Sequence, residues 1–99
     1  MKKMTYAIMG SLLFLSASAV FADSCDQAAY FYKKGQYRSA ITIISPLLKK
    51  GEACAEYYMG KMYYEGYGVK PNEKKALKLI RKAEAKGYPL AKSFMNSYH

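Results

Sequence analysis

The sequence predicts an all-α protein, a short α/α solenoid of two stacked helical hairpins and a C-terminal capping helix, behind an N-terminal export signal. Three observations support this fold class. Apolar residues recur at helical spacing, glycines and prolines separate the helical segments, and the pattern of the first half returns in the second. We expect a repeat domain over 23–99, with a first hairpin at 24–50, a second at 54–87 and a cap helix at 89–98.

The second hairpin begins with a helix whose apolar side recurs at spacings of three, four and one. This side consists of Ala55, Tyr58, Met59, Met62 and Tyr63. Gly60 lies inside the helix, where glycine costs about 1 kcal/mol against alanine. We therefore expect Gly60 to let the partner helix approach closely.

A loop over 65–72 separates this helix from the next one. Its glycines permit positive φ, and Pro71 is unsuited to a helix interior. Val69 is the apolar residue expected to fill the hairpin core from the loop, and Asn72 is expected to cap the second helix. Gly87 should end that helix, and Pro89 suits the first turn of another.

The first hairpin is a shorter version of the same unit. Tyr32 aligns with Tyr63 at an offset of 31, and Ala40 aligns with Ala76 at an offset of 36. The difference of five residues corresponds to the longer loop of the second hairpin. Pro46 interrupts the second helix of the first hairpin, so we expect it to bend or end the last turn.

The segment over 55–91 resembles one complete Sel-like repeat, a relative of the tetratricopeptide repeat. The matching residues are Ala55, Met59, Gly60, Tyr63, Gly66, Gly68, Val69, Ala76, Ala83, Gly87 and Ala91. The resemblance implies helical hairpins that stack into a binding surface and rarely perform chemistry. It also implies that the first helices of successive hairpins line a concave face.

Aromatic and basic residues on these first helices are the candidate contacts for a protein partner. They are Tyr30, Lys33, Tyr57, Lys61 and Tyr64. Tyrosine offers a large contact area with a polar tip and little loss of entropy. The alternative is an ordinary amphipathic surface that carries some tyrosines.

A basic ridge is predicted along the second helix of the second hairpin, where lysines step by four residues. Its members are Lys74, Lys78, Arg81, Lys82 and Lys86, with Lys75 beside them. Like charges at this spacing repel, and few acidic neighbours offset them. The ridge is either a solvated helix face or a site for an acidic partner, which includes an acidic protein, anionic lipid and cell-wall polymer.

Residues 1–22 have the pattern of a secretory signal peptide. Lys2 and Lys3 precede a short apolar run, and small residues follow it. We expect cleavage after Ala22, with Ala19 as a second site and an uncleaved anchor as the alternative. The protein would then be periplasmic or secreted in a bacterium, and export argues against a nucleic-acid partner.

Removal of these 22 residues, two of them lysines, would leave 77 residues with 14 basic and 7 acidic side chains, a net charge of about +7. Such a short stack needs additional stabilisation. Cys25 and Cys54 begin equivalent helices at the same end of the stack, so we expect a disulfide, with two buried free thiols as the alternative. It would close a loop of about 30 residues, which is worth roughly 3.5 kcal/mol.

The sequence offers little for catalysis, and we expect no enzyme, no cofactor and no metal site. The single histidine, His99, is the last residue of the sequence, and two cysteines with one histidine make no zinc set. Gly66 and Gly68 lack the context of a nucleotide-binding loop.

Three functions remain open from the sequence. The first is an exported adaptor that binds another envelope or secreted protein through its concave face. The second, which the resemblance suggests, is a periplasmic immunity protein that blocks a toxic effector such as a phospholipase. The third is a peripheral binder of anionic lipid or cell-wall polymer.

Overall fold

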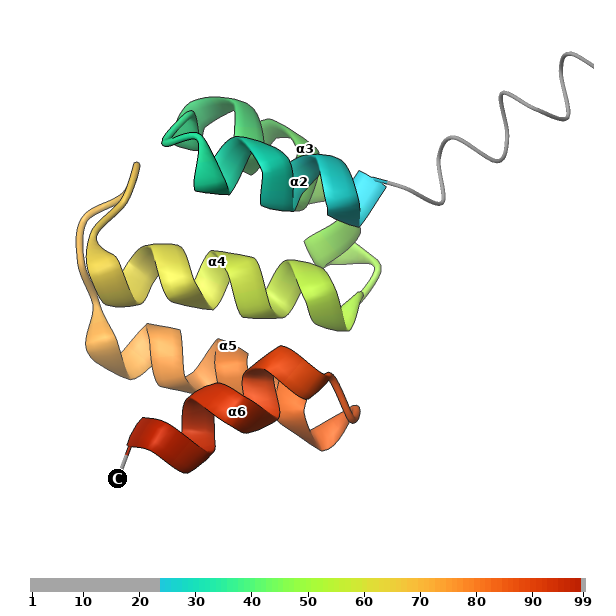
Figure 1. The fold of residues 1–99 in the computed structure, drawn as a ribbon, viewed down its shortest axis with the longest axis vertical. Coiled ribbons are helices and arrows are strands. Elements are labelled where there is room, and N and C mark those ends of the chain that lie inside the picture. Colours follow the sequence, from blue (N-terminus) through green and yellow to red (C-terminus); the bar gives the residue numbers. More distant parts are fainter. Residues whose placement is uncertain (1–23, 99) are drawn as a thin grey trace, which may run out of the picture.

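The computed structural model describes residues 24–98, and this part of the chain is helical, without strands. Five helices follow one another along the described residues (Figure 1), and none of them has the length and apolar character needed to cross a membrane. They are α2 (Ser24–Lys33), α3 (Tyr37–Lys49), α4 (Ala53–Glu65), α5 (Glu73–Ala85) and α6 (Pro89–Tyr98). The all-α solenoid class predicted from the sequence is confirmed. The expected signal peptide and His99 lie outside the described residues.

Helix α4 is central to the arrangement. It pairs with α5 in the most extensive helix contact of the domain, and it also packs on α2 and α3. Helix α6 packs on α5 at the far end (Figure 1). The loop between α4 and α5 extends toward the turn that joins α2 to α3, so the second hairpin contacts the first through this loop as well.

The ends of the helices follow from local chemistry. At the end of α4, Gly66 adopts a φ of 77°, a left-handed conformation that favours glycine, and its amide donates to the carbonyl oxygen of Met62 at 2.8 Å. Asn72 caps α5 as expected, because its side-chain oxygen accepts a hydrogen bond from the Lys75 amide at 3.0 Å. These two residues determine where the loop begins and ends.

Gly60 is the point of closest approach between α4 and α5. A Cβ atom at this position would lie 2.6 Å from Cγ1 of Ile80 and 3.0 Å from the carbonyl oxygen of Ala76. Both distances are shorter than the ordinary van der Waals contact of a Cβ atom with a carbon or with a carbonyl oxygen. The expectation that Gly60 admits the partner helix is therefore confirmed.

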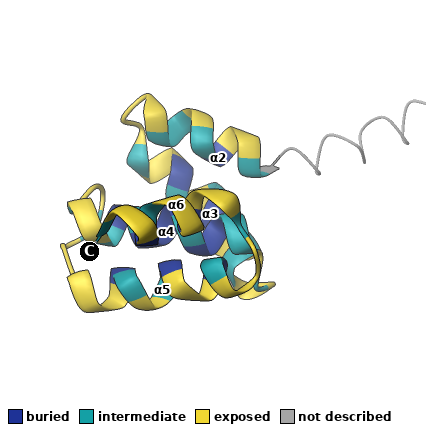
Figure 2. Ribbon diagram, turned by 60° about the horizontal axis from the view of Figure 1, so that its bottom comes forward, coloured by how far each residue is buried: buried dark blue, intermediate teal, exposed yellow. Residues whose placement is uncertain are grey.

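The interior lies between the helices, where Figure 2 shows the buried sides of α4 and α5 facing each other. One cluster joins the first hairpin to α4, and a second joins α5 to α6. The fully buried members include Ala40, Ile44, Met62, Ala76, Ile80 and Ala83. Alanines alternate with larger residues, which lets neighbouring helices pack closely.

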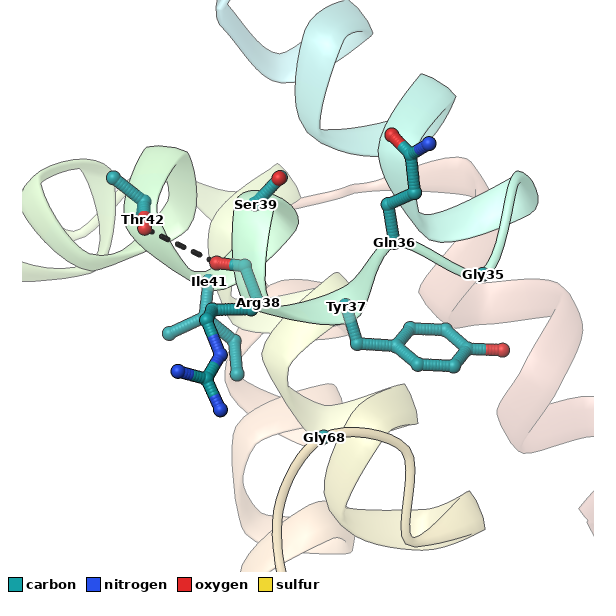
Figure 3. A pocket seen from close by; sticks show the side chains of 8 residues that line it. All are labelled: Gly35, Gln36, Tyr37, Arg38, Ser39, Ile41, Thr42 and Gly68. Carbon is teal, nitrogen blue, oxygen red and sulfur yellow. Dashed lines mark hydrogen bonds between the residues drawn. The ribbon is translucent and has the colours of Figure 1, made fainter.

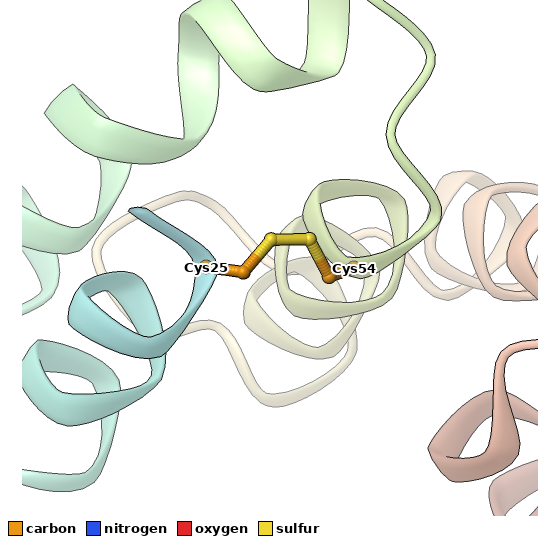
Figure 4. The surroundings of a disulfide bond; sticks show 2 residues. All are labelled: Cys25 and Cys54. Carbon is orange, nitrogen blue, oxygen red and sulfur yellow. A yellow bond between two sulfur atoms is a disulfide. The ribbon is translucent and has the colours of Figure 1, made fainter. Parts of the chain in front are cut away.

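A disulfide joins Cys25 and Cys54, as the sequence analysis predicted (Figure 4). The two Cα atoms are 6.3 Å apart, within the range that a disulfide spans. The bond links the first turns of α2 and α4 and so connects the two hairpins covalently at one end of the stack.

Pro46 does not end α3, contrary to one of the two outcomes expected from the sequence. The helix continues through it to Lys49. Pro46 has no amide hydrogen to donate to the carbonyl of Thr42, but both residues are exposed. Water can therefore replace the missing hydrogen bond, and the helix persists for another turn.

We predict that Gly60→Ala destabilises the domain by about 1–2 kcal/mol. Overpacking against Ile80 costs about 1–3 kcal/mol, and the better helix propensity of alanine returns at most about 1 kcal/mol. Urea unfolding followed by circular dichroism measures the change. The cost of Gly60→Ala should shrink in an Ile80→Ala background, and equal costs in both backgrounds would contradict the steric explanation.

We predict that the double variant Cys25→Ser/Cys54→Ser is less stable than the oxidised protein by about 3.5 kcal/mol, because the unfolded chain regains the entropy that the cross-link removes. The urea midpoint measures the loss. The reduced wild-type protein is the control and should unfold at the midpoint of the double variant. An unchanged midpoint in the double variant would show that the bond adds nothing to stability.

Candidate protein-interaction surface

Three of the five predicted partner-binding residues lie on the side of α4 that faces α6. The ring of Tyr57 has its centroid 5.5 Å from that of Tyr88, and the ring of Tyr64 lies 5.1 Å from that of Phe94. The ammonium of Lys61 lies 5.2 Å above the ring of Phe94. Helix α6 thus covers part of Lys61 and Tyr64, and Tyr88 just before α6 covers part of Tyr57, while Tyr64 remains 37% exposed.

The other two predicted residues, Tyr30 and Lys33, lie on α2. Tyr30 is the most exposed large apolar side chain in the described part of the domain, at 55%. Its ring contacts Phe31 edge-on at 5.5 Å, and the ammonium of Lys34 lies 5.4 Å from its centroid. Within residues 24–98, no ring contact or ion pair joins Tyr30 or Lys33 to the three residues on α4, so the candidate surface has two parts.

A cluster of tyrosines joins the first hairpin to the loop after α4. The rings of Tyr37 and Tyr67 stack at 4.6 Å, and Tyr32 contacts both of them as well as Tyr58. From the sequence, only Val69 was expected to pack from this loop. Val69 does pack against the core, but the contact of Tyr67 was missed because no local pattern indicates which loop residue packs back on the first hairpin.

Burial raises the pKa of several of these tyrosines. Tyr58 is 7% exposed, and its pKa rises to about 12, first through loss of solvation and then through nearby groups that include Tyr88 and Asp26. Its hydroxyl is hydrogen-bonded to Tyr88. Burial also raises the pKa of Tyr32. These hydroxyls therefore remain neutral at physiological pH.

A buried carboxylate, Glu56, is a feature that the sequence analysis missed. It is 2% exposed, and its Oε2 accepts a hydrogen bond from the ammonium of Lys86 at 2.9 Å. The ammonium of Lys82 lies 3.9 Å from the same oxygen, and Lys86 also donates to the carbonyl oxygen of Gly51 at 2.6 Å. A glutamate on the apolar side of α4 was the available signal, because such a residue needs a cation.

The predicted basic ridge is consequently divided in two. Lys82 and Lys86, at its C-terminal end, have Glu56 as an acidic neighbour. The expectation that few acidic neighbours offset the ridge was therefore wrong for these two lysines. Lys74, Lys78 and Arg81 are exposed along the rest of α5.

An open depression lies where the first turn of α3 meets the loop around Gly68 (Figure 3). The α3 N-terminus has no side-chain cap, and Thr42 donates its hydroxyl to the carbonyl oxygen of Arg38 at 3.1 Å. The lining residues are Gly35, Gln36, Tyr37, Arg38, Ser39, Ile41, Thr42 and Gly68. None of them is an acid, a histidine or a thiol, so this depression contains no general acid–base pair.

Between residues 24 and 98, no group of three or more His, Cys, Asp and Glu side chains is arranged to hold a metal ion. Both cysteines are joined in the disulfide and provide no thiol nucleophile. The side chains that the surface does offer are tyrosines and lysines.

Comparison with protein families agrees with the geometry of α4, the loop and α5. Residues 55–88 match the model of the Sel1 repeat. Such repeats generally mediate protein binding, and the match covers one of the two hairpins. No curated protein and no solved structure matches the chain.

We predict that the unfolding free energy of this protein falls as the pH rises from about 10 to 12. The pKa of Tyr58 is about 12 in the fold and about 10 in the unfolded chain, so its contribution is complete below pH 10 and is lost through this interval. Urea unfolding at pH 8, 10 and 11 measures the slope.

In Tyr58→Phe the unfolding free energy should fall less between pH 10 and 12 than in the wild type, by an amount on the order of 2 kcal/mol. The measurement at pH 8 serves as the control, because a loss of packing or of the Tyr88 hydrogen bond lowers stability there as well. An identical slope in the variant and the wild type would rule out Tyr58 as the titrating group.

Proposed function

We propose that this protein is an exported interaction module that binds another envelope or secreted protein through the aromatic surface on its first helices. We define the aromatic surface as Tyr30 and Lys33 on α2 together with Tyr57, Lys61 and Tyr64 on α4. One observation carries the proposal: large aromatic side chains stay exposed on the first helices of both hairpins although a packed core is available beside them.

The surroundings of these tyrosines suit them to binding. Tyr64 contacts Phe94 at 5.1 Å and Tyr98 at 6.2 Å, so its ring loses little freedom when a partner covers it. Tyrosine is enriched at the centres of protein interfaces for this reason, and because its hydroxyl can form hydrogen bonds at the rim. The Sel1 repeat that contains Tyr64 supports the same function, since these repeats generally bind proteins.

Two further observations support export. Lys2, Lys3 and the apolar run after them form a leader pattern, and the Cys25–Cys54 disulfide suits an oxidising compartment. Export restricts the expected partner to proteins of the cell envelope or the exterior.

We predict that Tyr30→Ala/Tyr64→Ala weakens partner binding by about a thousandfold, since each truncation of an interface hot spot costs about 2 kcal/mol, or about thirtyfold. These two tyrosines are chosen because they are exposed, whereas Tyr57 packs between Tyr58 and Tyr88. The wild-type protein serves as bait in an envelope extract, and affinity for the captured protein is then measured by titration.

The matched control is Lys74→Gln/Lys78→Gln, which alters an exposed face of α5 outside the aromatic surface. It should bind the captured partner as the wild type does, and thermal melts should show that both variants are folded. Unchanged affinity in the double tyrosine variant would refute the proposed surface.

A further inference from the structure

Helix α5 separates its charges around its axis. Its buried side carries Ala76, Ile80 and Ala83, and Figure 2 shows the opposite side exposed along its length. Two shallow depressions run along the exposed side, and neither has an acidic residue in its lining. One is lined by Lys74, Lys78, Arg81, Lys82 and Ala85, and the other by Asn72, Lys74, Lys75, Lys78, Leu79 and Lys82.

The acidic residues of α5 lie away from this exposed side. Glu73 is hydrogen-bonded to the hydroxyl of Tyr98 on α6, and Glu84 is half-buried. At 100° per residue, both stand on the flank of α5 next to its buried stripe. The exposed flank is therefore cationic without interruption, and we call Lys74, Lys75, Lys78 and Arg81 the lysine face.

The core of the lysine face has no internal counter-charge. The ammonium groups of Lys74 and Lys78 form no hydrogen bond or ion pair with any residue between 24 and 98, whereas those of Lys82 and Lys86 lie beside Glu56. The ammonium of Lys75 lies 4.8 Å from the ring centroid of Tyr63, a cation–π contact that supplies no negative charge. Cations one turn apart repel each other, so an anionic surface placed against them would relieve that repulsion.

The composition of the lysine face favours lipid over a protein partner. Protein interfaces are enriched in aromatic residues and arginine and are depleted in lysine. The large exposed apolar side chains of the described domain are all on other elements, namely Tyr30, Tyr64, Tyr67 and Leu90. Lysine is a flexible, hydrated point charge, which suits a fluid layer of phosphate headgroups better than a fixed set of hydrogen bonds.

We propose that the lysine face docks this domain on a membrane surface of anionic phospholipid, by electrostatic adsorption without insertion. The site is separate from the aromatic surface and the proposal does not rest on the protein-binding function. No large apolar side chain of α5 is exposed beside the lysine face. The attraction to the membrane therefore depends on charge alone and weakens with salt.

The experiment is co-sedimentation with vesicles of three parts phosphatidylcholine and one part phosphatidylglycerol, and with vesicles of phosphatidylcholine alone. The full-length gene is expressed, and mass spectrometry confirms that all variants share the same N-terminus. We expect binding to the anionic vesicles in 50 mM salt and little binding to them in 500 mM salt or to the neutral vesicles.

The variant Lys74→Gln/Lys78→Gln/Arg81→Gln should bind the anionic vesicles about a hundredfold more weakly, given the contribution of each basic residue near such a surface. The control Lys34→Gln/Arg38→Gln/Lys92→Gln removes three charges from exposed residues on other parts of the domain and should lose far less. All six residues are exposed, so thermal melts should show both variants folded.

Three results would overturn the proposal. Equal binding to neutral and anionic vesicles would remove the electrostatic basis. Equal losses in the two triple variants would show only a general attraction of the net charge. The third result is displacement of the protein from the vesicles by an acidic protein or a DNA duplex whose concentration of negative charge is lower than that of the lipid. This result would assign the lysine face to that polyanion instead.

Discussion

The approach of α4 to α5 at Gly60 determines the positions of most other features of this domain. With no Cβ at this residue, Ile80 and the carbonyl of Ala76 lie directly against the α4 backbone. The two axes are then close enough for Glu56 to reach Lys86, and the lysine face of α5 points away from the core. A larger residue would separate the helices and weaken these contacts together.

The ion pair of Glu56 and Lys86 orients helices α4 and α5, which Gly60 allows to approach closely. A buried carboxylate is costly to desolvate, and Oε1 of Glu56 has no hydrogen-bond partner among the described residues. Lys86 also donates to Gly51, so one ammonium connects α4, the end of α5 and the loop after α3. The pair therefore specifies how these three segments meet, and the net stability that it adds is secondary.

The disulfide and α6 complete a stack that is short for its class. Repeat architectures usually need three units to bury their apolar sides. Here the disulfide holds α2 to α4 at one end. At the other end, α6 packs Ala91 and Met95 against Ile80 and Ala83 of α5, which completes the second core cluster. Phe94 of the same helix contacts Lys61 and Tyr64, and Tyr88 just before it contacts Tyr57, so the cap also shapes the candidate binding surface.

Features that depend on local chemistry or on repeated spacing could be predicted from the sequence alone. The helical segments follow from the apolar period, the Asn72 cap and the Gly66 turn from residue type, and the pairing of Cys25 with Cys54 from their equivalent places in two hairpins. Gly60 was interpretable for the same reason, because glycine inside a helix needs a steric explanation.

The contacts between side chains distant in sequence, in contrast, emerge from the packing of the helices. Lys86 and Glu56 are 30 residues apart, and their pairing reduced the predicted ridge to the lysine face. The stacking of Tyr67 on Tyr37 depends on how the loop folds back, and the persistence of α3 beyond Pro46 depends on exposure to solvent. These outcomes depend on the relative placement of whole helices, which local spacing does not encode.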